Sequence, residues 1–385
     1  MKKKILGVAL AAVMMFGSTG AVMAADSTYS FDKVYNLDGI TGKENSSPAE
    51  TFSFVAGTLT NNNAEAENKA SLYWVEDSSY NSKNVTDREL VSGLKNDAIP
   101  AAVKTLTLGT VGYEAGGASD NDDNKSEKSV TVTVPDASAF GSVGYYYYQF
   151  HEKQGDTAGV TYSSNTYYIR VAVICDSANT LKIGGVKLYV SNAEDPNSIN
   201  KVLAVGNLYS AGALKLSKEV TGNLGNPDQE FAVSVKFKAP SNKKIKLPII
   251  ISTINGDGLN NPEKIEIADN VGENQVSTTV QVKDKTEVEF SNVPAGVTYE
   301  VEETKSEGYD NPKYLTEANP TTPTETEPSG NIEAASSTNI KIINNKEEKI
   351  DTGVFTSNIP YIIILAGAAA CLVLFFAGKK RRTED

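Results

Sequence analysis

The sequence predicts an all-β protein that consists of two tandem β-sandwich domains. Apolar and polar residues alternate in short runs, as at Phe52 and Phe54 and at Phe231 and Val233, and a period of two is that of a half-buried strand. Turn-forming clusters such as Asn-Gly-Asp-Gly at residues 255–258 separate the runs. Short strands with frequent turns are typical of β-sandwiches.

The composition excludes several kinds of functional site. The chain has 385 residues with one His and two Cys, and its formal net charge is −12. So few imidazoles and thiols argue against a disulfide framework, a Cys/His zinc site and haem or iron–sulfur ligation. We therefore expect no metal and no cofactor. The acidic balance argues against a nucleic-acid partner.

The period of two also places the single His and one of the thiols. Cys175 shares a strand face with Val171 and Val173, so we expect a buried, inert thiol. His151 lies on the opposite face from Glu152, so we expect its ring to be exposed.

The first element, residues 1–24, is predicted to be a signal peptide. Lysines at positions 2–4 precede an apolar stretch that ends at Phe16, and small residues lead to Ala24. A charged segment, a short apolar segment and a small-residue cleavage site predict export by the Sec route.

Two strand-rich domains follow, which we expect at residues 26–210 and 211–348. Ser210, Ala211 and Gly212 separate two strand-like runs, and such small residues are common between elements. The first domain is long for a seven-stranded sandwich, and we expect its excess length in polar loops.

The last element, residues 349–385, is predicted to tether the chain to a membrane. Residues 361–378 carry no charge and precede four basic residues at 379–382. Such a segment is just long enough for a transmembrane helix, and its basic tail is expected to stay in the cytoplasm. Everything upstream then lies outside the cell. Thr352 and Gly353 stand immediately before this segment.

Each domain contains a Lys, a Glu and an Asn that the period of two aligns with apolar residues. They stand near the start, in the middle and at the end of each domain, as Lys33, Glu152 and Asn207 and as Lys218, Glu303 and Asn344. Glu302 and Asn345 are neighbouring alternatives, but they lie on the opposite strand face from Val301 and Ile342, so parity favours Glu303 and Asn344.

A covalent reaction would remove the cost of burying these polar groups. Burial lowers the pKa of a Lys and raises that of a Glu, so a neutral amine and a protonated acid can coexist. The amine can then attack the Asn side-chain carbonyl while Glu hydrogen-bonds that oxygen and transfers protons. Ammonia leaves, and an amide joins the first strand to the last.

Several motifs resemble known sequences. Phe-Asp-Lys at 31–33, Pro-Ala-Glu-Thr-Phe-Ser-Phe at 48–54 and the tyrosine-rich run 144–152 resemble the pilin isopeptide-linkage domain of Gram-positive backbone pilins. Residues 216–223 and 340–346 are similar to the C-terminal domain of that family.

This resemblance implies immunoglobulin-like sandwiches with spontaneous Lys–Asn bonds and a catalytic Glu. Matched by position, the implied bonds and their catalysts are Lys33–Asn207 with Glu152 and Lys218–Asn344 with Glu303.

The C-terminal order of a Thr-Gly motif, an apolar span and a basic tail resembles the cell-wall sorting signal of Gram-positive surface proteins. In that family a membrane sortase cuts between Thr and Gly, here Thr352 and Gly353, and transfers the Thr carbonyl to an amine. The common motif begins with Leu-Pro, whereas this chain has Lys349 and Ile350. The sortase class, and the choice between wall and membrane anchoring, stay open.

The resemblance implies a structural, non-enzymatic pilus subunit at the surface or cell wall of a Gram-positive bacterium. Its implied partners are sortase, other pilin subunits or peptidoglycan, a possible host ligand, and the membrane before processing. Lys201 is the candidate acceptor for the next subunit, with Lys187 as a competitor. Because the chain lacks a Tyr-Pro-Lys-Asn motif, polymerisation stays open. The alternative is an anchored adhesin or minor pilin of the same fold.

Overall fold

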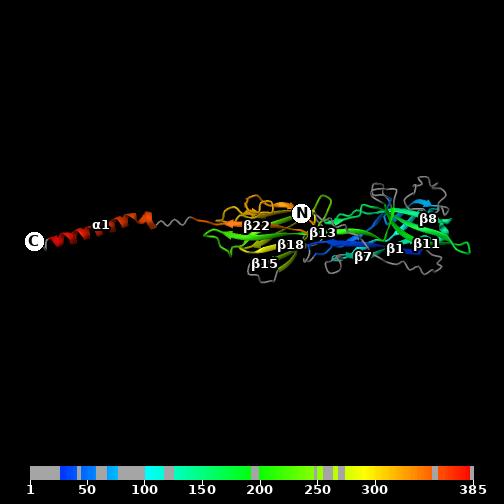
Figure 1. Ribbon diagram of the computed structural model, residues 1–385, viewed down its shortest axis with the longest axis horizontal. Coiled ribbons are helices and arrows are strands. Elements are labelled where there is room, and N and C mark those ends of the chain that lie inside the picture. The colour runs from blue at the N-terminus through cyan, green and yellow to red at the C-terminus, as the bar shows by residue number, and fades with distance from the viewer. Residues whose placement is uncertain are drawn as a thin grey trace.

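The structure is a computed structural model, and the predicted all-β fold class is confirmed. It describes residues 27–40, 45–57, 67–76, 100–116, 125–191, 199–246, 249–254, 263–267, 274–348 and 354–381. In these ranges the chain forms β-strands, two short 3₁₀ helices and one α-helix at the C-terminal end. The strands form two groups that lie end to end along the long axis (Figure 1).

The first group is built around β1, β8 and β13. Its members are β1 (Ser27–Asp38), β2 (Glu50–Phe52), β3 (Phe54–Ala56), β4 (Lys69–Glu76), β5 (Thr105–Leu108), β6 (Val111–Tyr113), β7 (Lys125–Val134), β8 (Gly144–Glu152), β9 (Val160–Thr161), β10 (Thr166–Cys175), β11 (Leu181–Ser191), β12 (Ile199–Val202) and β13 (Ala204–Thr221), with the 3₁₀ helices η3 (Ala101–Val103) and η4 (Ala137–Phe140). The main sheet runs in the order β12-β11-β10-β8-β4-β5-β7-β1-β13, and β2 pairs with β6.

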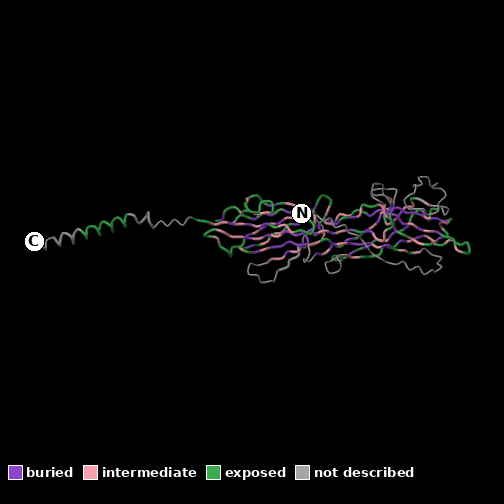
Figure 2. Tube along the Cα trace, in the orientation of Figure 1, coloured by how far each residue is buried: buried purple, intermediate pink, exposed green. Residues whose placement is uncertain are grey.

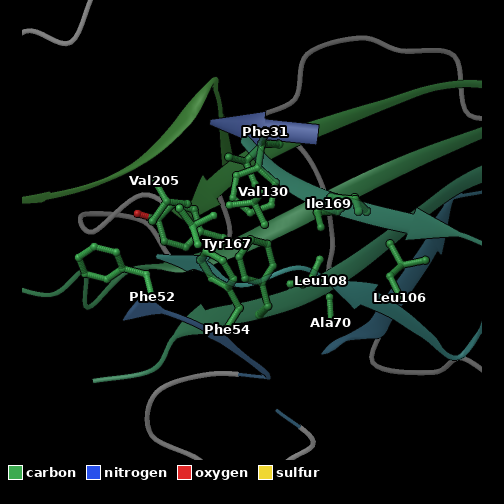
Figure 3. Packing of buried hydrophobic residues seen from close by; sticks show 14 of the residues in the cluster. Phe31, Phe52, Phe54, Ala70, Leu106, Leu108, Val130, Tyr167, Ile169 and Val205 are labelled. Carbon is green, nitrogen blue, oxygen red and sulfur yellow. The ribbon is translucent and has the colours of Figure 1, made fainter. Parts of the chain in front are cut away.

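Aromatic side chains fill the core of this group. Phe31 and Phe54 meet edge to face with their ring centroids 5.5 Å apart, and Figure 3 shows both rings between the strands that carry them. The inward positions are alternate residues of each strand, as the period of two predicts.

The second group starts on the same strand, β13. Its other members are β14 (Phe231–Lys238), β15 (Ile249–Ile254), β16 (Glu263–Ile267), β17 (Gln275–Val282), β18 (Glu287–Pro294), β19 (Thr298–Glu303), β20 (Lys313–Leu315), β21 (Ser329–Asn331) and β22 (Ser337–Asn345). One sheet contains β13 with β18, β15 and β16 on one side and β22 and β20 on the other, and the second has the order β17-β14-β19-β21. A separate apolar core, which includes Phe237 and Phe290, lies in this group.

β13 runs without a break through Ser210, Ala211 and Gly212, where the sequence suggests a separation of two strands. The small residues have a packing cause. A Cβ at Gly212 would lie 2.3 Å from the carbonyl oxygen of Glu333 and 2.9 Å from that of Ser336, so only glycine permits this approach. The two cores therefore share one continuous strand.

Two of the sequence expectations are wrong. Cys175 is exposed, because the pairing of β10 with β8 ends at Val173 and Gly144, so Cys175 lies beyond the core. His151 is buried, and its Nδ1 lies 3.1 Å from the carbonyl oxygen of Gly57, just after β3, which pairs with β8 and covers this position.

Helix α1 (Val354–Arg381) covers the segment 361–378, and its described side chains are exposed (Figure 2). Within the ranges that the structure describes, no helix is long and apolar enough to cross a membrane. The membrane span expected at 361–378 is thus not confirmed. The signal segment 1–24 and the motif 349–353 lie outside the described residues.

Candidate functional sites: two buried Lys–Glu–Asn clusters

The first cluster joins Lys33, Glu152 and Asn207. Lys33 lies on β1, Glu152 ends β8 and Asn207 lies on β13. β1 and β13 are parallel neighbours in which Lys33 pairs with Val205, so Asn207 stands two residues further along the same face. Strand alternation turns both side chains into the core, where they meet Glu152.

Hydrogen bonds connect all three side chains. Asn207 Nδ2 donates to Glu152 Oε1 at 2.7 Å, and Lys33 Nζ donates to Asn207 Oδ1. Lys33 Nζ lies 3.6 Å from Glu152 Oε2, which also accepts from the backbone N–H of Ser163 at 3.2 Å. The carboxamide of Asn207 is therefore held between an amine and a carboxyl group.

Burial shifts both titratable groups toward their neutral forms. Lys33 and Glu152 are 0% exposed. Desolvation lowers the pKa of Lys33 to about 8, although the charge of Glu152 opposes the shift. Desolvation also raises the pKa of Glu152, against the attraction of Lys33. A neutral amine has the free lone pair that a nucleophile needs.

The second cluster repeats this arrangement with Lys218, Glu303 and Asn344. Lys218 lies on β13, Glu303 ends β19 and Asn344 lies on β22. β13 and β22 are again parallel, and Lys218 pairs with Ile342. Asn344 therefore stands two residues beyond the partner of the lysine, which is the same offset as in the first cluster.

In the second cluster the carboxyl group lies closer to both the lysine and the asparagine than in the first. Lys218 Nζ donates to Glu303 Oε2 at 2.7 Å and also to Asn344 Oδ1. Asn344 Nδ2 donates to Glu303 Oε1 at 2.5 Å. All three residues are buried, and desolvation lowers the pKa of Lys218 while its hydrogen bond to Glu303 opposes the shift.

Sequence reasoning did not assign a role to an aromatic ring beside each lysine. Lys33 Nζ lies 4.2 Å from the ring centroid of Phe52, and Lys218 Nζ lies 4.2 Å from that of Phe231. Each ring excludes water from the amine on one side. Phe52 lies on β2, which follows the strand of Lys33, and Phe231 lies on β14, which follows the strand of Lys218. This shared order in the sequence is the signal that could have identified the two rings.

The neighbouring alternatives lie outside the second cluster. Glu302 is exposed. Asn345 donates through Nδ2 to Asp310 Oδ2 at 2.9 Å and accepts from Thr221 Oγ1 at 3.0 Å. The choice by strand face therefore selected the two residues that lie in the buried cluster, Glu303 and Asn344. Their chemical role stays a prediction.

This arrangement suits one reaction, the attack of a lysine amine on an asparagine carboxamide. The expectation that the glutamate hydrogen-bonds the asparagine oxygen is wrong: in both clusters the lysine donates to that oxygen, and the glutamate accepts from the leaving nitrogen. The carboxyl group is therefore placed to protonate that nitrogen. Among the residues that the structure describes, no group of three or more His, Cys, Asp or Glu is arranged to hold a metal ion.

The residues predicted for intermolecular linkage are only partly described. Lys201 is exposed on β12, and Lys187 is exposed on β11. Both line one small cavity together with Phe31 and Val202. Thr352 and Gly353 lie outside the described residues.

Comparison with known proteins shows that this chain is similar to a pilin. Residues 212–346 match a family described as a domain of unknown function, DUF7601. Over 252 residues the chain is 25% identical to a protein named Pilin from Streptococcus pyogenes serotype M1, an alignment that covers 63% of this chain and 69% of that protein. This sequence relative confirms the predicted resemblance to Gram-positive pilins.

Two solved structures are similar at lower identity. The major pilin from Streptococcus pyogenes is 18% identical with a TM-score of 0.48, covering 83% of this chain and 99% of that chain. The major pilin T3.2 from Streptococcus pyogenes serotype GAS13637 is 17% identical with a TM-score of 0.46, covering 82% and 97%.

Proposed function

We propose that this chain is a structural pilus subunit, displayed at the surface of a Gram-positive bacterium and cross-linked internally by two Lys–Asn bonds. The observation that carries the proposal is the repeated cluster, in which Lys, Glu and Asn occupy the same register offset in both groups of strands. Buried ions cost several kcal/mol each, so two such clusters need a chemical reason. The relative named Pilin supports the same function.

The proposed reaction in each cluster is a transamidation. The neutral lysine Nζ attacks Cγ of asparagine, the bond from Cγ to Nδ2 breaks, and Nδ2 leaves as ammonia after taking the proton that Nζ loses. Glu152 or Glu303 transfers this proton. The product is a neutral amide, so the lysine can no longer carry a buried positive charge, and the carboxyl group is regenerated. Each site reacts once, which makes the reaction a self-modification without turnover.

The two bonds differ in their place along the chain. In a fibre in which sortase joins Thr352 of one subunit to Lys201 of the next, tension enters at Lys201 and leaves after β22. β13 follows Lys201 directly, and the Lys218–Asn344 bond connects β13 to β22. Tension then passes from β13 to β22 through an amide and bypasses the chain between them. The Lys33–Asn207 bond stabilises the first group by constraining its unfolded state.

The internal bonds are tested by the intact mass of residues 25–352, which contain every described strand. We expect a deficit of two ammonia molecules, and of one in each of the variants Lys33→Ala and Lys218→Ala. Folded protein with its full calculated mass would contradict the transamidation.

Fibre formation needs a separate test. The full chain is expressed with the sortases of its own host, and wall extracts are examined for a ladder of covalent multimers. We expect Lys201→Arg to abolish the ladder, while Lys187→Arg keeps it. If the wild-type chain is anchored but forms no ladder, the protein is an anchored adhesin or minor pilin of this fold, linked to peptidoglycan or retained in the membrane. A ladder that survives Lys201→Arg but not Lys187→Arg would assign the acceptor to Lys187.

A further inference from the structure

Three basic residues gather on the outer face of the first group of strands. Arg170 on β10 pairs in register with Lys187 on β11, and Tyr189, two residues further along β11, pairs with Lys201 on β12. Strand alternation places all of these on one face. Lys187 and Lys201 are exposed. We call Arg170, Lys187 and Lys201 the basic patch.

The charges of the basic patch are not neutralised within the described part of the chain. None of its three members takes part in any ion pair there. The Arg170 guanidinium lies over the rings of Tyr145 and Tyr189, with its carbon 4.8 and 5.3 Å from their centroids, and its buried Nε has no hydrogen-bond partner. The two rings hold the guanidinium in place without cancelling its charge.

Mutual repulsion supports the same view of the patch. Lys201 and, to a smaller extent, burial and Arg170 lower the pKa of Lys187. Within the described residues, no carboxylate forms an ion pair with any of these three positive charges, in a chain whose net charge is −12. Such a local positive field attracts an acidic partner and disfavours the binding of a basic one.

The C-terminal end of the exported chain carries an acidic segment that fits. Glu347, Glu348 and Asp351 place three carboxylates within five residues, against one ammonium at Lys349, and Thr352 follows. Glu347 and Glu348 are exposed. This segment is opposite in sign to the basic patch, because its three carboxylates and one ammonium leave a net charge of −2.

A chain's own acidic segment is too far away to reach its own basic patch. Lys201 stands just before the start of β13, whereas Asn345 pairs with Thr221 at the end of β13. β13 has 18 residues, and at about 3.3 Å per residue it spans roughly 60 Å. The six residues from 346 to 351 extend over only about 20 Å. Figure 1 shows β11 and the C-terminal helix at opposite ends of the long axis.

We propose that the basic patch binds the acidic segment 347–351 of a second copy of this chain, head to tail. The contact places Thr352 of one copy beside Lys187 and Lys201 of the next. A heterologous contact of this kind generates an open filament rather than a closed ring. The inference rests on the proposed function for the covalent step, but the recognition itself needs no sortase.

The test measures binding of a labelled peptide with the sequence of residues 347–352 and blocked ends. Fluorescence anisotropy is recorded with residues 25–352 at low and at physiological ionic strength. The double variant Lys187→Glu/Lys201→Glu is compared with Lys104→Glu/Lys238→Glu, which changes the net charge equally at exposed lysines outside the patch. A second peptide replaces the three acidic residues by Gln, Gln and Asn.

We expect the acidic peptide to bind, to weaken about tenfold or more with the patch variant, and to be little changed by the control variant. Raising the salt concentration also weakens binding, because screening shortens the range of the charges. No binding, or equal binding by both variants or of both peptides, overturns the inference. If ladders form while the peptide does not bind, the inference fails and the proposed function stands. If the peptide binds but no ladders form, the inference stands and the proposed fibre-forming function fails.

Discussion

Replacing Glu303 by Gln separates the role of the carboxyl group from the volume of its side chain. Glu303 accepts hydrogen bonds from both Lys218 and Asn344, and the two candidate reactants stay in place in Glu303→Gln. Gln cannot transfer the proton from the amine to the leaving nitrogen. We therefore expect the second bond to fail while the first still forms.

The expected loss of stability follows from the length of the bridged loop. Lys218 and Asn344 are 126 residues apart in sequence. The chain-entropy treatment of a cross-link of that size gives about 5 kcal/mol, and a buried Lys left without its carboxylate partner costs a further 3–5 kcal/mol or so. For a domain of this size, the roughly 5 kcal/mol of the cross-link alone corresponds to a decrease of about 15 °C in Tm, and the unpaired lysine adds to this decrease.

The assay combines intact mass with thermal unfolding of residues 25–352. After correction for the mass change of the substitution, Glu303→Gln should show a deficit of one ammonia molecule instead of two. The Tm of the second group of strands should fall by about 15 °C or more. Glu302→Gln is the matched control, because Glu302 is the exposed neighbour on the opposite face. If Glu303→Gln still loses two ammonia molecules, the assigned mechanism is wrong. It is also wrong if the control Glu302→Gln loses only one.

Three further predictions test the surroundings of the clusters. In Asn207→Ala the bond cannot form, and Lys33 keeps a folded-state pKa of about 8 against its ordinary 10.5. Between about pH 8 and pH 10.5 the unfolded chain therefore binds more protons than the folded chain. The free energy of unfolding should rise with pH over this range. Urea titrations at both ends of that range, with the bonded wild type as reference, check this sign, and a flat or falling difference would contradict it. Phe52→Ala should admit water to Lys33 and lower the bonded fraction in a mass time course. Phe140→Ala, which removes a similarly buried ring on η4 and not on a strand that carries the cluster, should cost a similar 3–5 kcal/mol or so and leave the bond intact. Cys175 is exposed, so a maleimide should label folded residues 25–352 completely, and a thiol that reacts only after denaturation would show that it is buried.

The candidate sites were predictable because they break a simple pattern. Lys33 and Lys218 stand on the apolar face of strands, and the period of two is a local property of the chain. The same rule failed at Cys175 and His151. Cys175 lies past the last residue that β10 pairs with β8, and His151 is covered by a segment almost one hundred residues earlier in the sequence. Periodicity gives the face of a strand, but it gives neither the end of the sheet nor what packs on the outer face.

The fold class, both Lys–Glu–Asn sets and the acidic character of the chain could be read from residue type and local spacing. The remaining features depend on how distant strands pair. The parallel pairing of β13 with both β1 and β22 sets the two-residue offset between each lysine and its asparagine. It also makes Ser210–Gly212 part of one strand that both cores share. Strand pairing is a non-local interaction between segments more than one hundred residues apart, so no local pattern in the chain specifies it.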